Sequence, residues 1–297
     1  MDKNNIVTVP EAMQETAGAI TWWELGGNSI MEDLEDALDA EGLTDDWIKP
    51  SAPSLTVALS RAASSALSSK RHLLRPLSKR GHWEIVYEMV FRTPTGTETL
   101  RYRTIVQGHV AKENGVETPR IRIVDVDAGP DLKTAILSKL PLYQSTLCVS
   151  DISSWLLGIA SSSLVSTVSL RQRGGFYFIP KDQLDFWNRV SRALQAASAH
   201  RVYGIPAMQT EEAVEAILSS LQREADTAMA EIEDYLAADV STRGLNSSIR
   251  KLSEVKAKVV RYSGLLNVQQ PALLDQAEQL TGLVQAALIS QQTRDAV

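Results

Sequence analysis

The sequence of 297 residues predicts an α+β fold, with a three-stranded antiparallel meander core, flanking helices and a C-terminal helical hairpin or bundle. The spacing of apolar residues supports this prediction. They recur every three or four positions near both ends of the chain, as in amphipathic helices, and every second position between residues 84 and 126, as in half-buried strands. We expect an acidic helical head and linker over residues 1–80, an α+β core over 81–209 and a helical bundle or coiled coil over 210–297.

The head is predicted to contain two helices. The segment ITWWELGG is expected to anchor the first helix on the core, Asn28 or Ser29 to cap it, and Gly42 to end it. Its apolar residues recur every four positions, at Ile30, Leu34 and Leu38. The prolines of the IKPSAPS linker argue against a continuous helix, and a second helix is expected from about Leu55 to Leu67.

Three strands are predicted in the middle of the chain. The alternating run from Ile85 to Phe91 is followed by the turn Pro94-Thr95-Gly96, and a second run extends from Leu100 to Val106. Asn114-Gly115 lies between this run and the segment RIRIVDV, which is the third strand. Asn-Gly is a strong signal for a tight turn, because both residues tolerate positive φ. These features predict the meander.

Alternating helices and strands are expected to complete the core. Helices are predicted at about 131–140, 151–165 and 181–198, with strands at 169–180 and 201–208. The uncharged stretch 152–170 has the length of a membrane span, but eight of its residues are Ser or Thr, which favours a buried helix. No secretory signal is recognised at the N-terminus. We therefore expect a soluble, cytoplasmic protein with no membrane partner.

The last ninety residues are predicted to be helical. Their apolar residues follow three heptad-like seams, which favour an antiparallel hairpin or three-helix bundle. The seams could be filled within one chain or by self-association, and the sequence leaves both open. The seam residues are Val214, Leu218, Leu221, Ala225, Ala228, Ile232 and Tyr235, then Leu245, Ile249, Leu252, Val259, Tyr262 and Leu266, and finally Leu273, Ala277, Leu280, Val284 and Ala287.

The sequence contains no familiar catalytic or cofactor-binding motif. A phosphate-binding loop, a dinucleotide fingerprint, a nucleophile elbow and a zinc-protease helix are all missing. Cys148 is the only cysteine, which excludes an internal disulfide and a multi-cysteine metal site. The four histidines are scattered. We predict no catalytic residues, no metal and no cofactor, and keep a hydrolase with an unrecognised site as an alternative.

Charge is unevenly distributed along the chain. Residues 1–59 carry 12 acidic and 2 basic residues, residues 60–125 carry 6 and 12, and residues 126–297 carry 18 and 16. The net charges are therefore −10, +6 and −2, which sum to the −6 of the whole chain. Either the acidic head and the basic segment neutralise each other, or the basic segment binds a polyanion while the head competes with it or recruits a partner.

Arginines in the predicted sheet form the candidate binding site. Arg101 and Arg103 share one face of the second strand, and Arg120 and Arg122 share one face of the third. In a meander these four residues are expected to form one cross-strand patch suited to phosphate contacts. Neighbouring basic residues are Lys70, Arg71, Lys79 and Arg80, and Tyr102 or Trp83 could add stacking if exposed. The alternative is that Glu84 and Glu88 pair with the arginines on a solvated face.

Four segments of this chain resemble an uncharacterised family of bacteriophage- and prophage-encoded proteins of about 300 residues. They are ITWWELGGNS (20–29), SAPSLTVALSRAA (51–63), GGFYFIP (174–180) and RVYGIPAMQTEEAVEAI (201–217). The resemblance implies a phage or host protein in the host cytoplasm with no assigned activity. The predicted order of elements is also similar to the core of phage single-strand annealing proteins, an analogy of fold that transfers no residues.

The leading functional prediction is non-enzymatic binding of nucleic acid, single strands included, by the basic sheet face of a self-associating protein. A second prediction is an adaptor or inhibitor in phage–host conflict, which would dock on a protein partner through residues 1–59. The hydrolase is the third. Homo-oligomerisation would involve the C-terminal helices.

Overall fold

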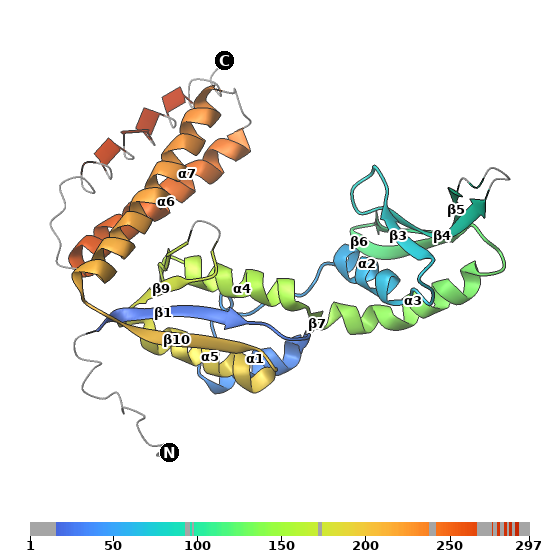
Figure 1. Ribbon diagram of the computed structural model, residues 1–297, viewed down its shortest axis with the longest axis horizontal. Coiled ribbons are helices and arrows are strands. Elements are labelled where there is room, and N and C mark those ends of the chain that lie inside the picture. The colour runs from blue at the N-terminus through green and yellow to red at the C-terminus, as the bar shows by residue number, and fades with distance from the viewer. Residues whose placement is uncertain are drawn as a thin grey trace. The chain divides into compact units, whose positions relative to one another are not determined.

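The computed structural model describes residues 16–92, 96, 98–171, 174–237 and 242–265, with scattered positions between 275 and 290 (Figure 1). The predicted mixture of helices with antiparallel sheets is confirmed. The chain divides into two compact units, which we call the central unit (26–155 and 196–199) and the terminal unit (1–25, 156–195 and 200–297). The predicted boundaries at residues 80 and 209 are not those of the two units.

The central unit is built around a four-stranded antiparallel sheet in the order β3-β4-β5-β6. A small two-stranded sheet pairs β2 with β7. The elements are β2 (Ser29–Ile30), α1 (Met31–Ala40), α2 (Leu55–Ser65), β3 (His72–Pro76), β4 (Trp83–Arg92), β5 (Glu98–Glu113), β6 (Val116–Ile123), α3 (Gly129–Gln144), β7 (Thr146–Leu147) and the start of α4 (Val149–Ser161).

A β-bulge interrupts the pairing of β4 with β5. Ile85 lies opposite Val106 and Val86 lies opposite Thr104, so Ile105 is an extra residue in β5. An extra residue changes the side to which the rest of its strand points, because side chains alternate with a period of two. Odd-numbered residues therefore point to one face of the sheet before Ile105 and to the other face after it. This determines the face on which Arg101 and Arg103 lie.

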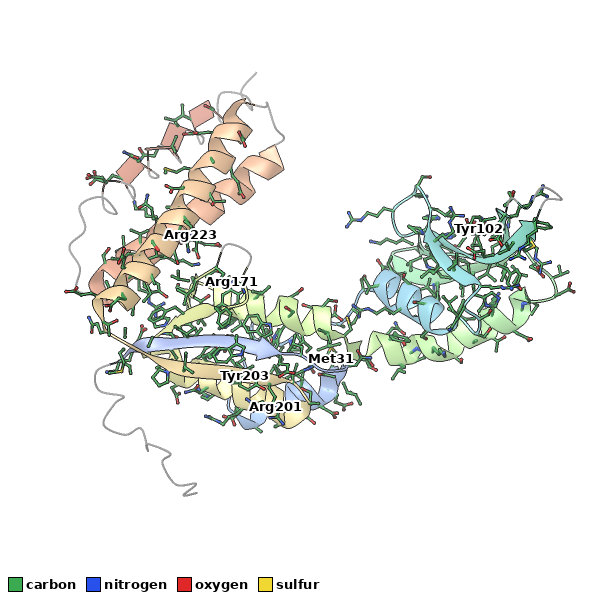
Figure 2. The ribbon with its side chains drawn as sticks, in the orientation of Figure 1. Met31, Tyr102, Arg171, Arg201, Tyr203 and Arg223 are labelled. Atoms are coloured by element: carbon green, nitrogen blue, oxygen red, sulfur yellow. The ribbon has the colours of Figure 1, made fainter. Side chains whose placement is uncertain are left out.

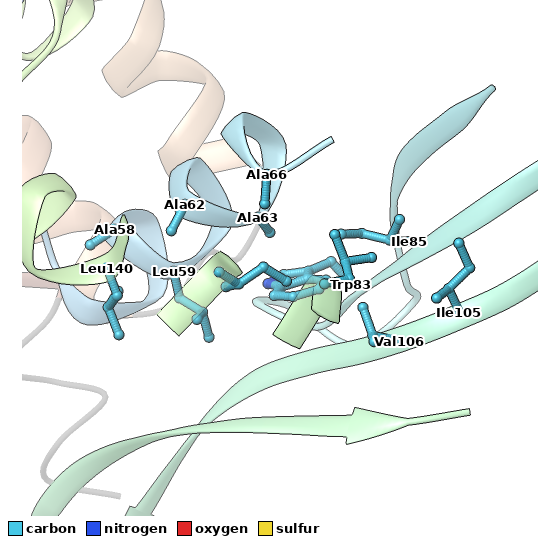
Figure 3. Packing of buried hydrophobic residues seen from close by; sticks show 12 residues of the cluster. Ala58, Leu59, Ala62, Ala63, Ala66, Trp83, Ile85, Ile105, Val106 and Leu140 are labelled. Atoms are coloured by element: carbon cyan, nitrogen blue, oxygen red, sulfur yellow. The ribbon is translucent and has the colours of Figure 1, made fainter. Parts of the chain in front are cut away.

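Helices α2 and α3 cover one face of this sheet and form the core with it (Figure 3). Small residues on α2 allow the helix to approach closely, and Ala58, Ala62 and Ala63 are fully buried. Trp83 from β4 is 4% exposed. Its ring occupies the space beside Gly108, where an added Cβ would overlap it. Trp83, which was a candidate for stacking on a ligand, is therefore part of the hydrophobic core.

The terminal unit contains a second antiparallel sheet in the order β10-β1-β9-β8. Its central strand is β1 (Thr16–Glu24), which pairs with β10 (Arg201–Met208) and β9 (Tyr177–Pro180), while β8 (Val168–Ser169) pairs with β9. The segment ITWWELGG, expected to anchor a helix, is therefore mostly strand. The strand was not predicted, because its partner β10 lies about 180 residues later in the sequence, beyond the reach of local patterns.

Helices pack against this second sheet. Trp187 of α5 (Leu184–Ala197), which follows a short 3₁₀ turn (Lys181–Gln183), donates its Nε1–H to Thr21 Oγ1 over 3.1 Å. Phe178 and Ala207 pack with α6 (Glu211–Ala237) and α7 (Thr242–Leu265) in one buried cluster. Tyr262 is fully buried there, and its hydroxyl donates to the Ser166 carbonyl over 2.9 Å.

Two details of the predicted helices are corrected or left open. Helix α1 begins at Met31 and its N-cap, Ile30, provides no side-chain hydrogen bond, because Ser29 belongs to β2 and pairs with Leu147. Gly42, with a φ of +70°, follows the end of α1 as expected. The turn at Pro94-Thr95 and most of the predicted helix after Pro271 lie outside the described residues. Among the helices described, none is long and apolar enough to cross a membrane.

Candidate nucleic-acid interface

The face of the β3–β6 sheet opposite α2 and α3 is open, and we call it the open face. Residues directly opposite each other on paired strands point to the same side, so the register assigns each side chain to a face. In the described strands, every side chain on this face except Val86 is exposed or half-buried. Those with hydrogen-bonding or charged groups are Arg75, Glu84, Glu88, Arg92, Glu98, Tyr102, Thr104, Gln107, His109, Glu113, Thr118, Arg120 and Arg122.

The predicted patch of four arginines does not form. Arg120 and Arg122 lie on the open face, opposite His109 and Gln107. Arg101 and Arg103 lie opposite Met89 and Tyr87, on the other face of the sheet. The bulge at Ile105 is the physical reason, because it reverses the alternation between the two ends of β5.

Arg101 and Arg103 have local partners on their own face. The Arg103 Nε lies 3.0 Å from Asp125 Oδ2. The pKa of Asp125 is lowered, first by hydrogen bonds from the backbone N–H groups of Ala128 and Asp127, and further by Arg103. The Arg101 guanidinium lies 5.1 Å from the centroid of the Phe91 ring. Arg103 thus supports the turn before α3 through Asp125 rather than forming part of a phosphate-binding patch.

Tyr102 provides an aromatic surface on the open face (Figure 2). Its side chain is 43% exposed, and the Arg75 guanidinium lies 4.8 Å from its ring centroid. Of the two aromatic residues proposed for stacking, Tyr102 is accessible and Trp83 is in the core. A tyrosine held beside an arginine presents a π-face and a cation together, which suits a nucleobase and its phosphate.

A pair of stacked histidines lies at the same face. The rings of His82 and His109 are 4.4 Å apart and nearly parallel, with an angle of 6° between them. The pKa of His82 is lowered, first by desolvation and further by His109 and Lys79. The uncharged form of the His82 ring is therefore favoured. The two rings offer a flat surface and ring N–H donors to a ligand.

The two arginines of β6 differ in their surroundings. Arg120 is held 2.5 Å from Glu113, and this hydrogen bond is the largest cause of the raised pKa of Arg120. Arg122 is exposed and makes no ion pair with any described residue. Glu84 accepts a hydrogen bond from Thr104 over 3.1 Å. Of the four arginines of the predicted patch, Arg120 pairs with Glu113 and Arg103 pairs with Asp125. Among the described residues, none of the four forms the ion pair with Glu84 or Glu88 that the alternative prediction required.

The remaining predicted basic residues lie in the turns on either side of β3. All four, Lys70, Arg71, Lys79 and Arg80, are exposed. The second turn is closed by a hydrogen bond from the Leu77 N–H to the His82 carbonyl, over 2.9 Å. At the start of the basic segment, Arg61 pairs with Asp151, so the identified carboxylate partners of this segment lie outside residues 1–59.

Sequence reasoning missed three members of the open face. Arg75 and the two histidines were not predicted, although His109 lies in the run that was recognised as a strand. Arg75 was missed because β3 was not predicted as a strand, and the register that places His109 opposite Arg120 was not visible in the sequence. In the described part of the chain, no group of three or more His, Cys, Asp or Glu side chains could hold a metal ion.

Comparison with known proteins gives a family and no activity. No curated protein and no solved structure matches this chain. The sequence model of a family described as "Family of unknown function (DUF6744)" matches residues 17–293, which is nearly the whole chain. The chain therefore belongs to this family of unknown function.

Proposed function

We propose that this protein binds single-stranded nucleic acid on the open face of the β3–β6 sheet. The observation that carries the proposal is an antiparallel sheet covered by helices on one face only, with Tyr102 and Arg75 stacked on the other. In this proposal, strands β4, β5 and β6 correspond to the predicted meander, and helices α6 and α7 correspond to the predicted helical hairpin.

The chemistry of the open face fits a single strand better than a duplex. Unstacked bases can lie on aromatic rings, and Tyr102 and the His82–His109 pair provide such rings on one surface. Arg122 has no competing carboxylate among the described residues, so it is available to a phosphate. Four further cations lie in the turns that flank β3 and add a sequence-independent attraction.

The test is the binding of a labelled single-stranded oligonucleotide to the full-length chain over a series of salt concentrations. A straight log–log plot with a negative slope is expected, because phosphate contacts release counterions. Arg122→Ala should reduce that slope by about 0.7, the value for one phosphate of a single strand. Tyr102→Ala should weaken binding at every salt concentration by about 1–3 kcal/mol, the usual value of one stacked base.

The bulge supplies a matched control for Arg122 on the neighbouring strand β5. Arg101→Ala removes the same charge from the opposite face of β5 and should leave both affinity and slope close to those of the wild type. Equal effects of Arg101→Ala and Arg122→Ala would show that only total charge matters and would overturn the assignment to the open face. A flat salt response of the wild-type chain would overturn nucleic-acid binding itself.

One observation favours the second predicted function, a protein-interaction adaptor. Helix α1 buries Leu34 and Leu38 completely while Glu32, Asp33 and Asp36 are exposed, so it presents an acidic surface. In this case a basic protein partner should bind the full-length wild-type chain and should not bind the triple variant E32Q, D33N and D36N. The full chain is needed because residues 16–24 are a strand of the terminal unit, and a 1–59 fragment would separate that strand from β9 and β10.

Phage origin, residence in the host cytoplasm and the hydrolase alternative stay predictions from the sequence. Self-association does too. Several seam residues of α6 and α7 are buried within the chain: Leu218, Leu221, Ala225, Ala228, Val259 and Tyr262. Oligomers would therefore need another surface or an exchange of these helices between chains, and the mass in solution tests this directly.

A further inference from the structure

A second candidate site lies in the terminal unit, on different elements from the open face. A cavity of about 340 Å³ is bordered by α6, α7 and the segment that follows α4. This volume lies within the range of about 300–1,000 Å³ that is usual for small-molecule sites. Its polar lining contains three cations, three glutamates and several hydroxyl groups, and the cations are Arg171, Arg223 and Lys258.

Two of the cations in this cavity are not neutralised by a described carboxylate. Arg223 donates to Ser220 Oγ over 2.7 Å, and neither Arg223 nor Arg171 forms an ion pair with a described residue. Lys258 instead lies 3.1 Å from Glu224, which also accepts the Ser169 N–H over 3.2 Å. The other two glutamates of the lining, Glu231 and Glu254, have interactions of their own. Two guanidinium groups therefore remain available for an anion.

An aromatic row begins beside Arg171, one of the residues that line the cavity. The Arg171 guanidinium lies 6.0 Å from the centroid of the Phe176 ring, which is 37% exposed. Phe176 is backed by Trp22, with centroids 5.6 Å apart, and Trp22 stacks on Tyr203 at 5.4 Å. The row continues from Phe176 to Trp22 on β1 and Tyr203 on β10, so a planar ring placed against Phe176 would lie next to the guanidinium of Arg171.

The backbone holds Arg171 and Phe176 together. The Leu170 N–H donates to the Phe176 carbonyl over 2.9 Å, and the Gly174 N–H donates to the Arg171 carbonyl over 3.1 Å. Gly174 and Gly175 have φ values of +72° and +99°, which other residues adopt only with strain. This explains the adjacent glycines in the sequence: they close the loop that places a cation beside an aromatic ring.

We propose that the cavity binds a mononucleotide, with its phosphate on Arg171 and Arg223 and its base against Phe176. The pairing of free guanidinium groups with an adjoining aromatic row selects a ligand that is both anionic and planar. The hydroxyl groups of Ser161 and Thr227 line the same cavity and suit the sugar and phosphate oxygens. This function is additional to nucleic-acid binding by the open face, since every residue named belongs to the terminal unit.

Isothermal titration of the full-length chain with adenosine monophosphate, uridine monophosphate, adenosine and inorganic phosphate tests the proposal. Both nucleotides should bind at least tenfold more tightly than phosphate or the nucleoside. Arg171→Ala and Arg223→Ala should each weaken nucleotide binding tenfold or more, since each removes a charge-assisted contact. Phe176→Ala should reduce the advantage of the nucleotides over phosphate while leaving phosphate binding unchanged.

Arg122→Ala is the control, because it removes the same charge from the central unit. It should leave nucleotide affinity unchanged, and unaltered melting temperatures should show that all variants are folded. Equal affinities for phosphate and nucleotides, or no binding at all, would overturn the proposal. Loss of oligonucleotide binding in a chain that still binds nucleotides would count against the open face alone.

Discussion

At the scale of single residues, Gly18 shows how closely the second sheet is packed. It lies on β1 opposite Pro180 of β9 and Ala207 of β10. A Cβ at this position would overlap the carbonyl oxygen of Ile179 and lie 2.8 Å from the ring of Phe178. The carbonyl belongs to a paired strand and cannot rotate away as a flexible side chain could. Glycine is therefore required by the approach of a neighbouring backbone.

Replacing Gly18 by alanine is expected to destabilise the terminal unit by about 1–3 kcal/mol, the usual cost of overpacking a close contact. The measurement is the urea concentration at half-unfolding. Gly204→Ala is the matched control, because Gly204 lies on the adjacent strand β10 and a Cβ there meets nothing within 4 Å. Similar effects of the two substitutions would contradict this explanation and point to backbone entropy instead.

At the scale of elements, an ion pair joins α2 to the start of α4 within the central unit. Both guanidinium nitrogens of Arg61 contact the Asp151 carboxylate, at 2.6 and 2.8 Å. Partial burial acts to raise the pKa of Asp151, but hydrogen bonds from Arg61 and the Cys148 backbone N–H outweigh it and hold that pKa below its ordinary value. Two carboxylate oxygens on one guanidinium also fix the relative orientation of the two helix segments.

Asp151→Asn should therefore destabilise the chain at neutral pH by about 1–2 kcal/mol. A carboxyl group with a lowered folded-state pKa stabilises the fold above its unfolded-state pKa, and this stabilisation is lost as the pH falls through the folded-state value. The difference from wild type should thus be present at pH 7 and shrink below about pH 4.

Urea unfolding of both proteins at several pH values measures this difference. The control is Glu117→Gln, which removes an exposed carboxylate of β6 and should have little effect at any pH. A difference between wild type and Asp151→Asn that stays constant down to pH 3 would show that the ionised carboxylate is not the source of the stability.

At the scale of the whole molecule, the chain leaves the terminal unit after residue 25 and returns to it at residue 156. Strand β1 pairs with β10 along eight residue positions, although the strands are far apart in sequence. The segment in between folds as the central unit with its own sheet and core. The central unit is thus an insertion between the first strand of the terminal unit and the remainder.

A fragment of residues 26–161, which keeps α4 whole, is expected to fold by itself and to bind the single-stranded oligonucleotide as the full chain does. It contains the complete β3–β6 sheet with α2 and α3. Cooperative thermal unfolding and the oligonucleotide affinity are the two measurements. Deletion of residues 1–25 from the full-length chain should instead expose the edges of β9 and β10 that pair with β1, and the truncated chain should aggregate. A soluble deletion variant with full stability would contradict the central position of β1.

The sequence by itself determined the mixed class, the positions of most elements and the concentration of positive charge between residues 60 and 125, because these depend on local periodicity and composition. Helix α2 and the end of α1 at Gly42 lie where the pattern indicated. Only the tertiary structure decided which arginines share a surface. One extra residue, Ile105, reverses the alternation of β5 and separates Arg101 and Arg103 from Arg120 and Arg122. It also decided that β1 is a central strand, since strand pairing between distant segments leaves no local signal in either of them.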